Sequence, residues 1–212
     1  MKKLKLFVSA LCLNLFAFAQ FEGGIEFRME TKKDTTMNAY LVKGNNIKLD
    51  QFGKKSGKIE GSFVFDLGAK QIKFVNPARK VWGDHKSETP PVIKGTCEVT
   101  KTKNTKSLMG KKCSEYIVKN TEENTIITYW ITADKFDFFV PMVKLWNRKD
   151  KASVYFNQLK DLPKGSMPML SIESTLDGKQ IGKLEVTKIE KKKIETSQVS
   201  VPTDYKKFEQ EN

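Results

Sequence analysis

The stretch GKKCSEYIVKNTEENTIITYWITADKFDFFVPMVKLW, residues 110–146, decides the fold class. Its first half is typical of two strands around a polar turn, and its second half is a dense apolar segment. From Phe136 onward, apolar residues recur at helical spacing, at Phe139, Val140 and Val143. A hairpin followed directly by apolar helical material predicts a sheet whose open face needs a cover.

The segments around this stretch show the two-residue period of strands with one buried face. In the first of them, Ile25, Phe27 and Met29 alternate with charged residues. Two later segments are each typical of a hairpin around a glycine-containing turn, and a segment with a Pro-Pro pair is typical of a loop. The hairpins are expected at residues 37–52 and 62–77, the loop at 82–95, and further strands at 96–103, 111–120, 124–132, 169–176, 179–190 and 194–201.

Short turns join most of these strands, which predicts antiparallel neighbours, because parallel strands need long crossovers. Asp177-Gly178 is a strong hairpin signal, and a second helix is expected over residues 151–162. Pro141 either kinks the first helix or begins it. A sheet of this size must curl. The predicted fold class is therefore mainly β (α+β): a curved antiparallel incomplete barrel of about eleven strands, with one or two helices covering its concave face.

The first 20 residues have a lysine-rich front, an apolar run and a small-residue pair that ends at Ala19. This pattern predicts a signal peptide over residues 1–20 that is cleaved near Ala19 or Gln20. Residues 21–212 would then form one domain, periplasmic or secreted. A lipoprotein signal using Cys12 is the alternative, but a bulky leucine precedes that cysteine.

The formal net charge is +13, and only three of the 38 basic residues are arginine. Recognition of nucleic acid favours the bidentate arginine fork over the flexible point charge of lysine. The composition therefore predicts a lysine-rich sheet exterior, with weak attraction to an anionic membrane surface as the alternative, and no nucleic-acid partner.

Without residues 1–20, the remaining cysteines are Cys97 and Cys113. If the chain turns at residues 104–106, the two cysteines lie opposite each other on neighbouring strands. Opposed residues have Cβ atoms about 4.5–5.5 Å apart, which small adjustments bring to disulfide geometry. We expect a structural disulfide, with two buried free thiols as the alternative.

No recognisable catalytic motif is present in the sequence. His85 is the only histidine and has no spaced partner residue, so we expect it to form neither a zinc site nor a Ser-His-Asp triad, and to be an ordinary loop residue. We expect the protein to have no enzymatic activity and to bind neither a metal nor a cofactor. A pair of carboxylates could in principle act as in a glycosidase, but we expect the candidates to be charges on the exterior face of the sheet. These candidates are Asp66, Glu98, Glu115 and Asp134.

Large apolar side chains are abundant, with 14 phenylalanines and 7 methionines. They fit a packed core, and they equally fit a hydrophobic cavity between sheet and helices that accepts an acyl chain or another apolar ligand. The sequence leaves both interpretations open. The residues expected to line such a cavity are Phe63, Phe65, Trp130, Phe136, Phe139, Val143 and Trp146.

Three segments carry a resemblance to a known family: TKSLMGKKCSEYIV at residues 105–118, TYWIT at 128–132 and VSVPTDYKKFE at 199–209. They resemble a bacterial exported family of unknown function within the lipoprotein-carrier (LolA/LolB-like) superfamily. The resemblance implies an incomplete antiparallel barrel with helices as a lid, and relatives that hold acyl chains beneath it. The function expected first is a non-enzymatic exported protein that binds a lipidic or other apolar ligand. A structural or protein-interaction module of the envelope, with a dry core and an envelope protein as partner, is the alternative.

Overall fold

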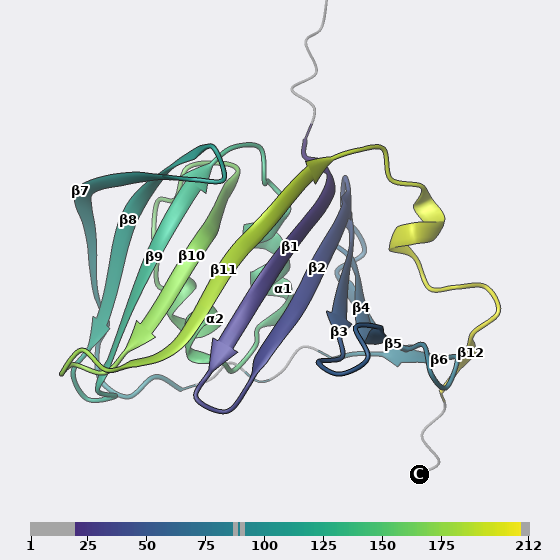
Figure 1. Cartoon of the computed structure of the whole chain (residues 1–212), viewed down its shortest axis with the longest axis horizontal. Helices are drawn as coiled ribbons and strands as arrows, with labels where there is room; N and C mark the ends of the chain where they lie inside the picture. The colour runs from purple at the N-terminus through teal and green to yellow at the C-terminus, as the bar shows by residue number, and fades with distance from the viewer. Residues whose placement is uncertain (1–19, 87–88, 90–91, 209–212) are drawn as a thin grey trace, which may run out of the picture.

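A computed structural model describes residues 20–86, 89 and 92–208. The predicted signal peptide, apart from Gln20, lies outside these residues. The described residues form one sheet of twelve strands, two α-helices and one 3-10 helix. Figure 1 shows that the sheet curves, so that β5 and β6 run across the direction of β8–β11, and that it does not close. The predicted fold class is confirmed.

The sheet consists of two meanders that meet at its centre. Its strand order is β12-β6-β5-β4-β3-β2-β1-β11-β10-β9-β8-β7, and all neighbours are antiparallel except β12 and β6. The first and last long strands of the chain, β1 and β11, therefore lie side by side (Figure 1). The strands are β1 (Glu22–Thr31), β2 (Thr35–Lys43), β3 (Asn46–Phe52), β4 (Ile59–Asp66), β5 (Gln71–Asn76), β6 (Val81–Asp84), β7 (Glu98–Leu108), β8 (Lys111–Asn120), β9 (Thr125–Ala133), β10 (Ser166–Ser174), β11 (Gln180–Lys191) and β12 (Lys206–Lys207).

The helices α1 (Phe139–Trp146) and α2 (Lys151–Phe156) lie behind the sheet in Figure 1, across its concave face. Pro141 lies in the first turn of α1, where a missing N–H is tolerated, so it does not kink the helix. The chain leaves α1 through Asn147 in the left-handed conformation, and α2 starts at Asp150, whose side chain accepts a hydrogen bond from the Ser153 N–H. The second helix is shorter than expected because it ends at Phe156.

Gly165 fixes the segment that leads into α1. Its carbonyl accepts hydrogen bonds from the N–H groups of Asp134 and Phe136, at 3.1 and 3.3 Å. Its φ is +74°, and a Cβ at this position would lie 2.7 Å from the Lys135 nitrogen. Only glycine meets both demands, so this residue allows the end of β9 to approach the start of β10 closely.

The predicted disulfide is wrong. The β7–β8 hairpin turns at Met109-Gly110, not at residues 104–106, and this shift of register places Cys113 opposite Lys106. Cys97 precedes β7 at its far end, where its sulfur lies 3.7 Å from the Asn120 amide. Both cysteines are free, because several residues of strand separate them.

The predicted strand over residues 194–201 is also wrong. Ile194 and Val199 are buried, but they flank a 3-10 helix, η1 (Thr196–Val199), in a segment that runs beside β2 and β3 to reach β12 (Figure 1). The Lys43 ammonium donates to the Ile194 carbonyl at 2.6 Å, and the Ile194 N–H donates to Glu22 at 2.7 Å. These side-chain partners replace the ladder bonds of a strand. The loop predicted over residues 82–95 also differs from the structure, because its first three residues belong to β6.

Candidate functional site

A pocket of about 180 Å³ lies between the concave face of the sheet and the two helices. Strands β1–β3 and β9–β11 supply one wall, and α1 and α2 supply the other. Its lining is mostly apolar. The aromatic and large aliphatic residues among the lining are Phe27, Met29, Tyr40, Leu49, Tyr129, Phe139, Met142, Val143, Trp146, Phe156, Ile181 and Leu184.

Ring contacts between neighbouring elements hold this lining in place. Tyr40 stacks on Phe27 across β1 and β2, with ring centroids 4.8 Å apart. Phe139 of α1 meets Phe156 of α2 edge-on at 5.4 Å. Such aromatic pairs add to the stability that burial provides. The walls are therefore well packed even though a space remains between them.

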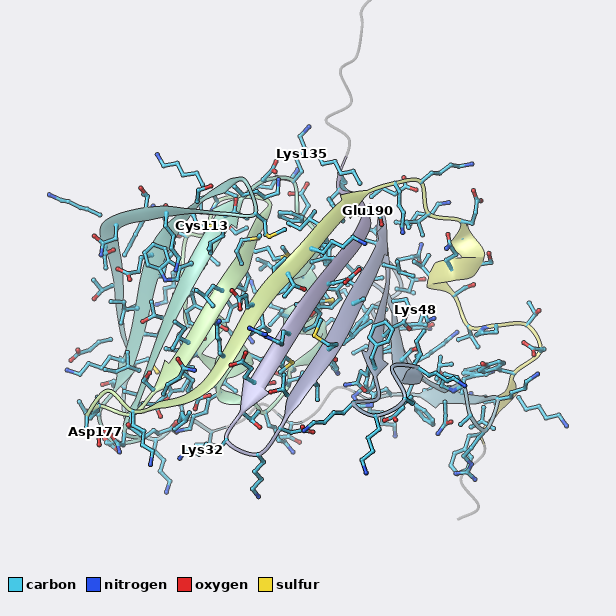
Figure 2. The ribbon with its side chains drawn as sticks, viewed as in Figure 1. Lys32, Lys48, Cys113, Lys135, Asp177 and Glu190 are labelled. Atoms are coloured by element: carbon cyan, nitrogen blue, oxygen red, sulfur yellow. The ribbon has the colours of Figure 1, made fainter. Side chains whose placement is uncertain are left out.

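The pocket has a polar rim at one end. Arg148 and Asp150, at the junction of the helices, form an ion pair at 2.8 Å, and the guanidinium lies 4.6 Å from the Trp146 ring. Thr31 also belongs to the rim of the pocket, and it is next to Lys32, which Figure 2 labels at the β1–β2 turn. The rim can solvate a polar group while the interior holds an apolar one.

Buried hydroxyl groups anchor α2 to the sheet. The Tyr129 hydroxyl donates to the Ala152 carbonyl at 2.6 Å, and the Tyr155 hydroxyl donates to Glu123 at 2.6 Å. The hydrogen bond from Tyr155 is the main cause of a lowered pKa at Glu123, and burial raises the pKa of Tyr155 well above its usual value. Lys151 also lies 3.5 Å from Glu123. These contacts fix one wall of the pocket.

Glu173 is a partly buried carboxylate in the pocket lining. Burial raises the pKa of its carboxyl group, and no ion pair joins it to another described residue. The described residues contain no cluster of three or more His, Cys, Asp and Glu side chains that could hold a metal ion. Among the described helices, none combines the length and the apolar content that a membrane span requires.

The structure brings three of the predicted lining residues into the pocket: Phe139, Val143 and Trp146. Phe63 and Phe65 lie behind them, with ring centroids 5.1 and 5.2 Å from that of Trp146.

Phe136 is buried beside Phe21 at the entry to α1, where it does not line the pocket. Trp130 is on the opposite face of β9, where the Lys106 ammonium lies 4.0 Å from its ring.

Tyr129 lines the pocket although it is not among the residues expected there; it is adjacent to Trp130, and strand alternation allows only one of the two to face inward. Met142 is a second unexpected lining residue, and the helical period could have identified it, because it follows Phe139 by three residues. His85 lies outside the pocket and packs edge-on against Phe63, at 5.2 Å between ring centroids. The four carboxylates considered as a glycosidase pair also lie outside it.

Comparison with known proteins gives one family match. The family described as "Domain of unknown function (DUF4412)" matches residues 21–205. None of the curated proteins matches the chain.

Among solved structures, an uncharacterized conserved protein from Thermus thermophilus is similar with a TM-score of 0.51 and 8% identity, over 88% of this chain and 90% of that one. This likeness concerns the fold alone.

Two further similar structures have lower TM-scores. The MucA/MucB complex of Pseudomonas aeruginosa gives a TM-score of 0.47 and 10% identity, over 88% of this chain and 56% of that one. A putative outer membrane lipoprotein-sorting protein domain from Vibrio parahaemolyticus gives a TM-score of 0.32 and 11% identity, over 84% of this chain and 87% of that one.

Proposed function

We propose that this chain, which belongs to the DUF4412 family, is a non-enzymatic binding protein that holds an apolar group between its sheet and its helices. The observation that carries the proposal is the pocket beneath α1 and α2, which has an apolar lining and a polar rim at one end. Ligand sites commonly combine apolar walls with a few polar groups that orient the guest. The guest would place its apolar part against Phe139 and Met142 and its polar end near Arg148.

The size of the pocket restricts the guest. Its volume of about 180 Å³ exceeds the roughly 150 Å³ of an apolar cavity that admits benzene. It lies below the roughly 300–1,000 Å³ of sites for drug-sized ligands. The pocket therefore suits a ring or the end of one acyl chain, and a lipid with two chains would need α1 or α2 to move.

The proposed setting is the cell envelope. The pattern of residues 1–20 supports export with cleavage near Ala19 or Gln20, and residues 21–212 would be the mature domain, periplasmic or secreted. The resemblance of the sequence to the lipoprotein-carrier superfamily supports a lipidic guest.

A second function, an interaction module for an envelope protein, is favoured by the edge strand β7. Most of its residues are exposed, and an edge strand can accept a strand from a partner. Lysines on an edge, such as Lys101 and Lys103, oppose such pairing. We therefore place ligand binding first.

Native mass spectrometry of the purified protein, followed by organic extraction, tests ligand binding. Uptake of a fluorescent fatty acid then compares the natural protein with two variants. Ser171→Leu places bulk in the pocket, since Ser171 is buried in its lining. Thr128→Leu is the matched control, because Thr128 is on the opposite face of β9 from Tyr129, directly beside Ile172 of β10.

We expect an apolar adduct or probe uptake in the natural protein and in Thr128→Leu, and at least tenfold weaker uptake in Ser171→Leu. An unliganded mass together with no uptake would overturn the proposal and favour the interaction module. Equal uptake by all three proteins would place the probe outside the pocket and overturn it as well.

A further inference from the structure

The tip of the β7–β8 hairpin carries a residue that neither packing nor backbone geometry explains. Met109 is 51% exposed, and its φ is +49°, followed by Gly110 at +72°. Two successive positive φ values are those of a type I′ turn, in which Asn-Gly is preferred. A methionine here exposes an apolar side chain and adopts a conformation that is unfavourable for its backbone.

Several lysines lie at the same end of the sheet as this tip. Lys112 follows it on β8, and the Lys111 ammonium pairs with Asp134 at the end of β9. Lys135 directly follows Asp134, and Lys191 lies at the end of β11, opposite Gly23 of β1. Both ammonium groups help to lower the pKa of the Asp134 carboxyl group, after the larger effect of Lys111. Figure 2 shows Lys135 and Cys113, the residue after Lys112, at the same end of the molecule.

Positive charge at this end is in excess. Lys112, Lys135 and Lys191 are exposed, and none of them forms an ion pair with another residue that the structure describes. Asp134 is already paired with Lys111. We call Met109, Lys112, Lys135 and Lys191 the basic tip.

We propose that the basic tip docks on the surface of an anionic lipid bilayer, with Met109 entering the headgroup layer and the lysines lying above it. Lysine suits this role because a flexible, hydrated point charge responds to a diffuse surface potential, whereas specific anion sites favour arginine. One exposed apolar side chain beside a few lysines is too small for a stable protein interface, which buries about 800 Å² on each partner. Charge complementarity therefore favours the bilayer as the occupant.

This docking does not depend on the pocket. The pocket residue Thr31 adjoins Lys32 at the β1–β2 turn, and Figure 2 places Lys32 at the end of the molecule opposite Lys135 of the basic tip; this part of the rim therefore lies far from the tip. Docking through the tip would turn the rim away from the membrane. The pocket would then exchange its guest with the aqueous side.

Vesicle sedimentation tests the docking. The purified protein is mixed with vesicles of phosphatidylcholine alone, or with about 30% phosphatidylglycerol as the anionic lipid, at low and at physiological salt. Lys112→Gln/Lys135→Gln removes two charges from the tip. Lys32→Gln/Lys33→Gln is the matched control, because these exposed lysines lie in the turn at the other end of the sheet (Figure 2). Met109→Asn removes the apolar side chain while favouring the same turn.

We expect binding to the anionic vesicles only, weakened by salt. The expected loss of partitioning is about fivefold for each tip lysine, hence about 25-fold for the double variant, and about tenfold for Met109→Asn. The control variant should bind like the natural protein.

Four results would each overturn the proposal: no binding to anionic vesicles, equal binding to neutral vesicles, an equal loss in the control variant, or unchanged binding of both tip variants. Urea unfolding of every variant shows that each one is folded, so lost binding is attributable to the surface.

Discussion

Replacing Ser171 with leucine decides whether the space under α1 and α2 is a usable cavity or a gap too tight to fill. Ser171 is 4% exposed and belongs to the pocket lining on β10, directly opposite Tyr129 of β9. A leucine would direct three additional carbon atoms, in place of one oxygen, toward the pocket.

The magnitude follows from the pocket volume. Each buried carbon contributes about 0.8 kcal/mol, so filling empty space would stabilise the fold by up to about 2 kcal/mol. In a fully packed core the same atoms would cost about 1–3 kcal/mol. A pocket of about 180 Å³ has room for them, so we expect the free energy of unfolding to rise.

Urea unfolding measures this change, provided that the free energy of unfolding falls with urea concentration at the same slope in both proteins. Ser62→Leu is the matched control. Ser62 is similarly buried, at 2% exposed, but its hydroxyl donates to Asp50 at 2.6 Å and it does not line the pocket. That variant should lose about 1–3 kcal/mol or more, because it crowds a packed site and removes a hydrogen bond from a buried carboxylate. If Ser171→Leu is destabilised as strongly as Ser62→Leu, the reasoning about free volume fails.

Four further predictions concern Trp146, Met109, Glu173 and the two cysteines. Trp146→Ala should lower the free energy of unfolding by about 3–5 kcal/mol in urea, because the ring is 7% exposed. Met109→Asn should raise it by about 1 kcal/mol, because asparagine tolerates a positive φ better; a loss of stability would contradict the assigned turn. Burial raises the pKa of Glu173 in the folded state, so folding favours its protonated form; this contribution is present below the unfolded pKa, near 4.3, and is lost as pH rises through the folded pKa. Glu173→Gln should therefore stabilise the fold more at pH 7 than at pH 4, and equal gains at both values would exclude this linkage. Peptide mapping without reductant should show no Cys97–Cys113 link, and alkylation of the native protein should modify half-buried Cys97 faster than buried Cys113.

Much of the sheet could be predicted because local signals and tertiary structure agree there. Asp177-Gly178 has the turn chemistry that its hairpin needs, and Gly178 has a φ of +86°. The alternation at Ile25 and Phe27 matches their burial on the inner face of β1. In such segments, a shift of the strand by one residue would move its apolar side chains to the solvent-exposed face, so the alternation specifies the register.

The β7–β8 hairpin could not be placed from sequence because its turn lacks the usual chemistry. Asn104 and its polar neighbours are more typical of a turn than Met109, yet they lie within β7, at an irregularity between Lys101 and Thr105. The mistaken disulfide between Cys97 and Cys113 follows from this one error of register.

The candidate pocket was predicted on its helical side and poorly on its sheet side. Helical spacing identifies one face, so Phe139, Val143 and Trp146 were placed together. On β9 the adjacent Tyr129 and Trp130 are both large and aromatic, and only the tertiary structure shows which of them is inside. Ser171 carries no apolar signal, so its place in the lining could not be read from the sequence.

The pairing of β1 with β11 affects the order in which the chain can fold. Arg28 and Glu185 lie 157 positions apart, yet their side chains meet at 3.1 Å at the centre of the sheet. During synthesis from the N-terminus, β1 to β6 can pair with one another as soon as they are made. The other edge of β1 stays unpaired until β11, the last long strand, has been made. Contacts between such distant residues slow folding, and an open edge invites aggregation. The two meanders are joined only when β11 pairs with β1. A chain that lacks β11 therefore still has its sheet in two separate halves, although it is almost complete.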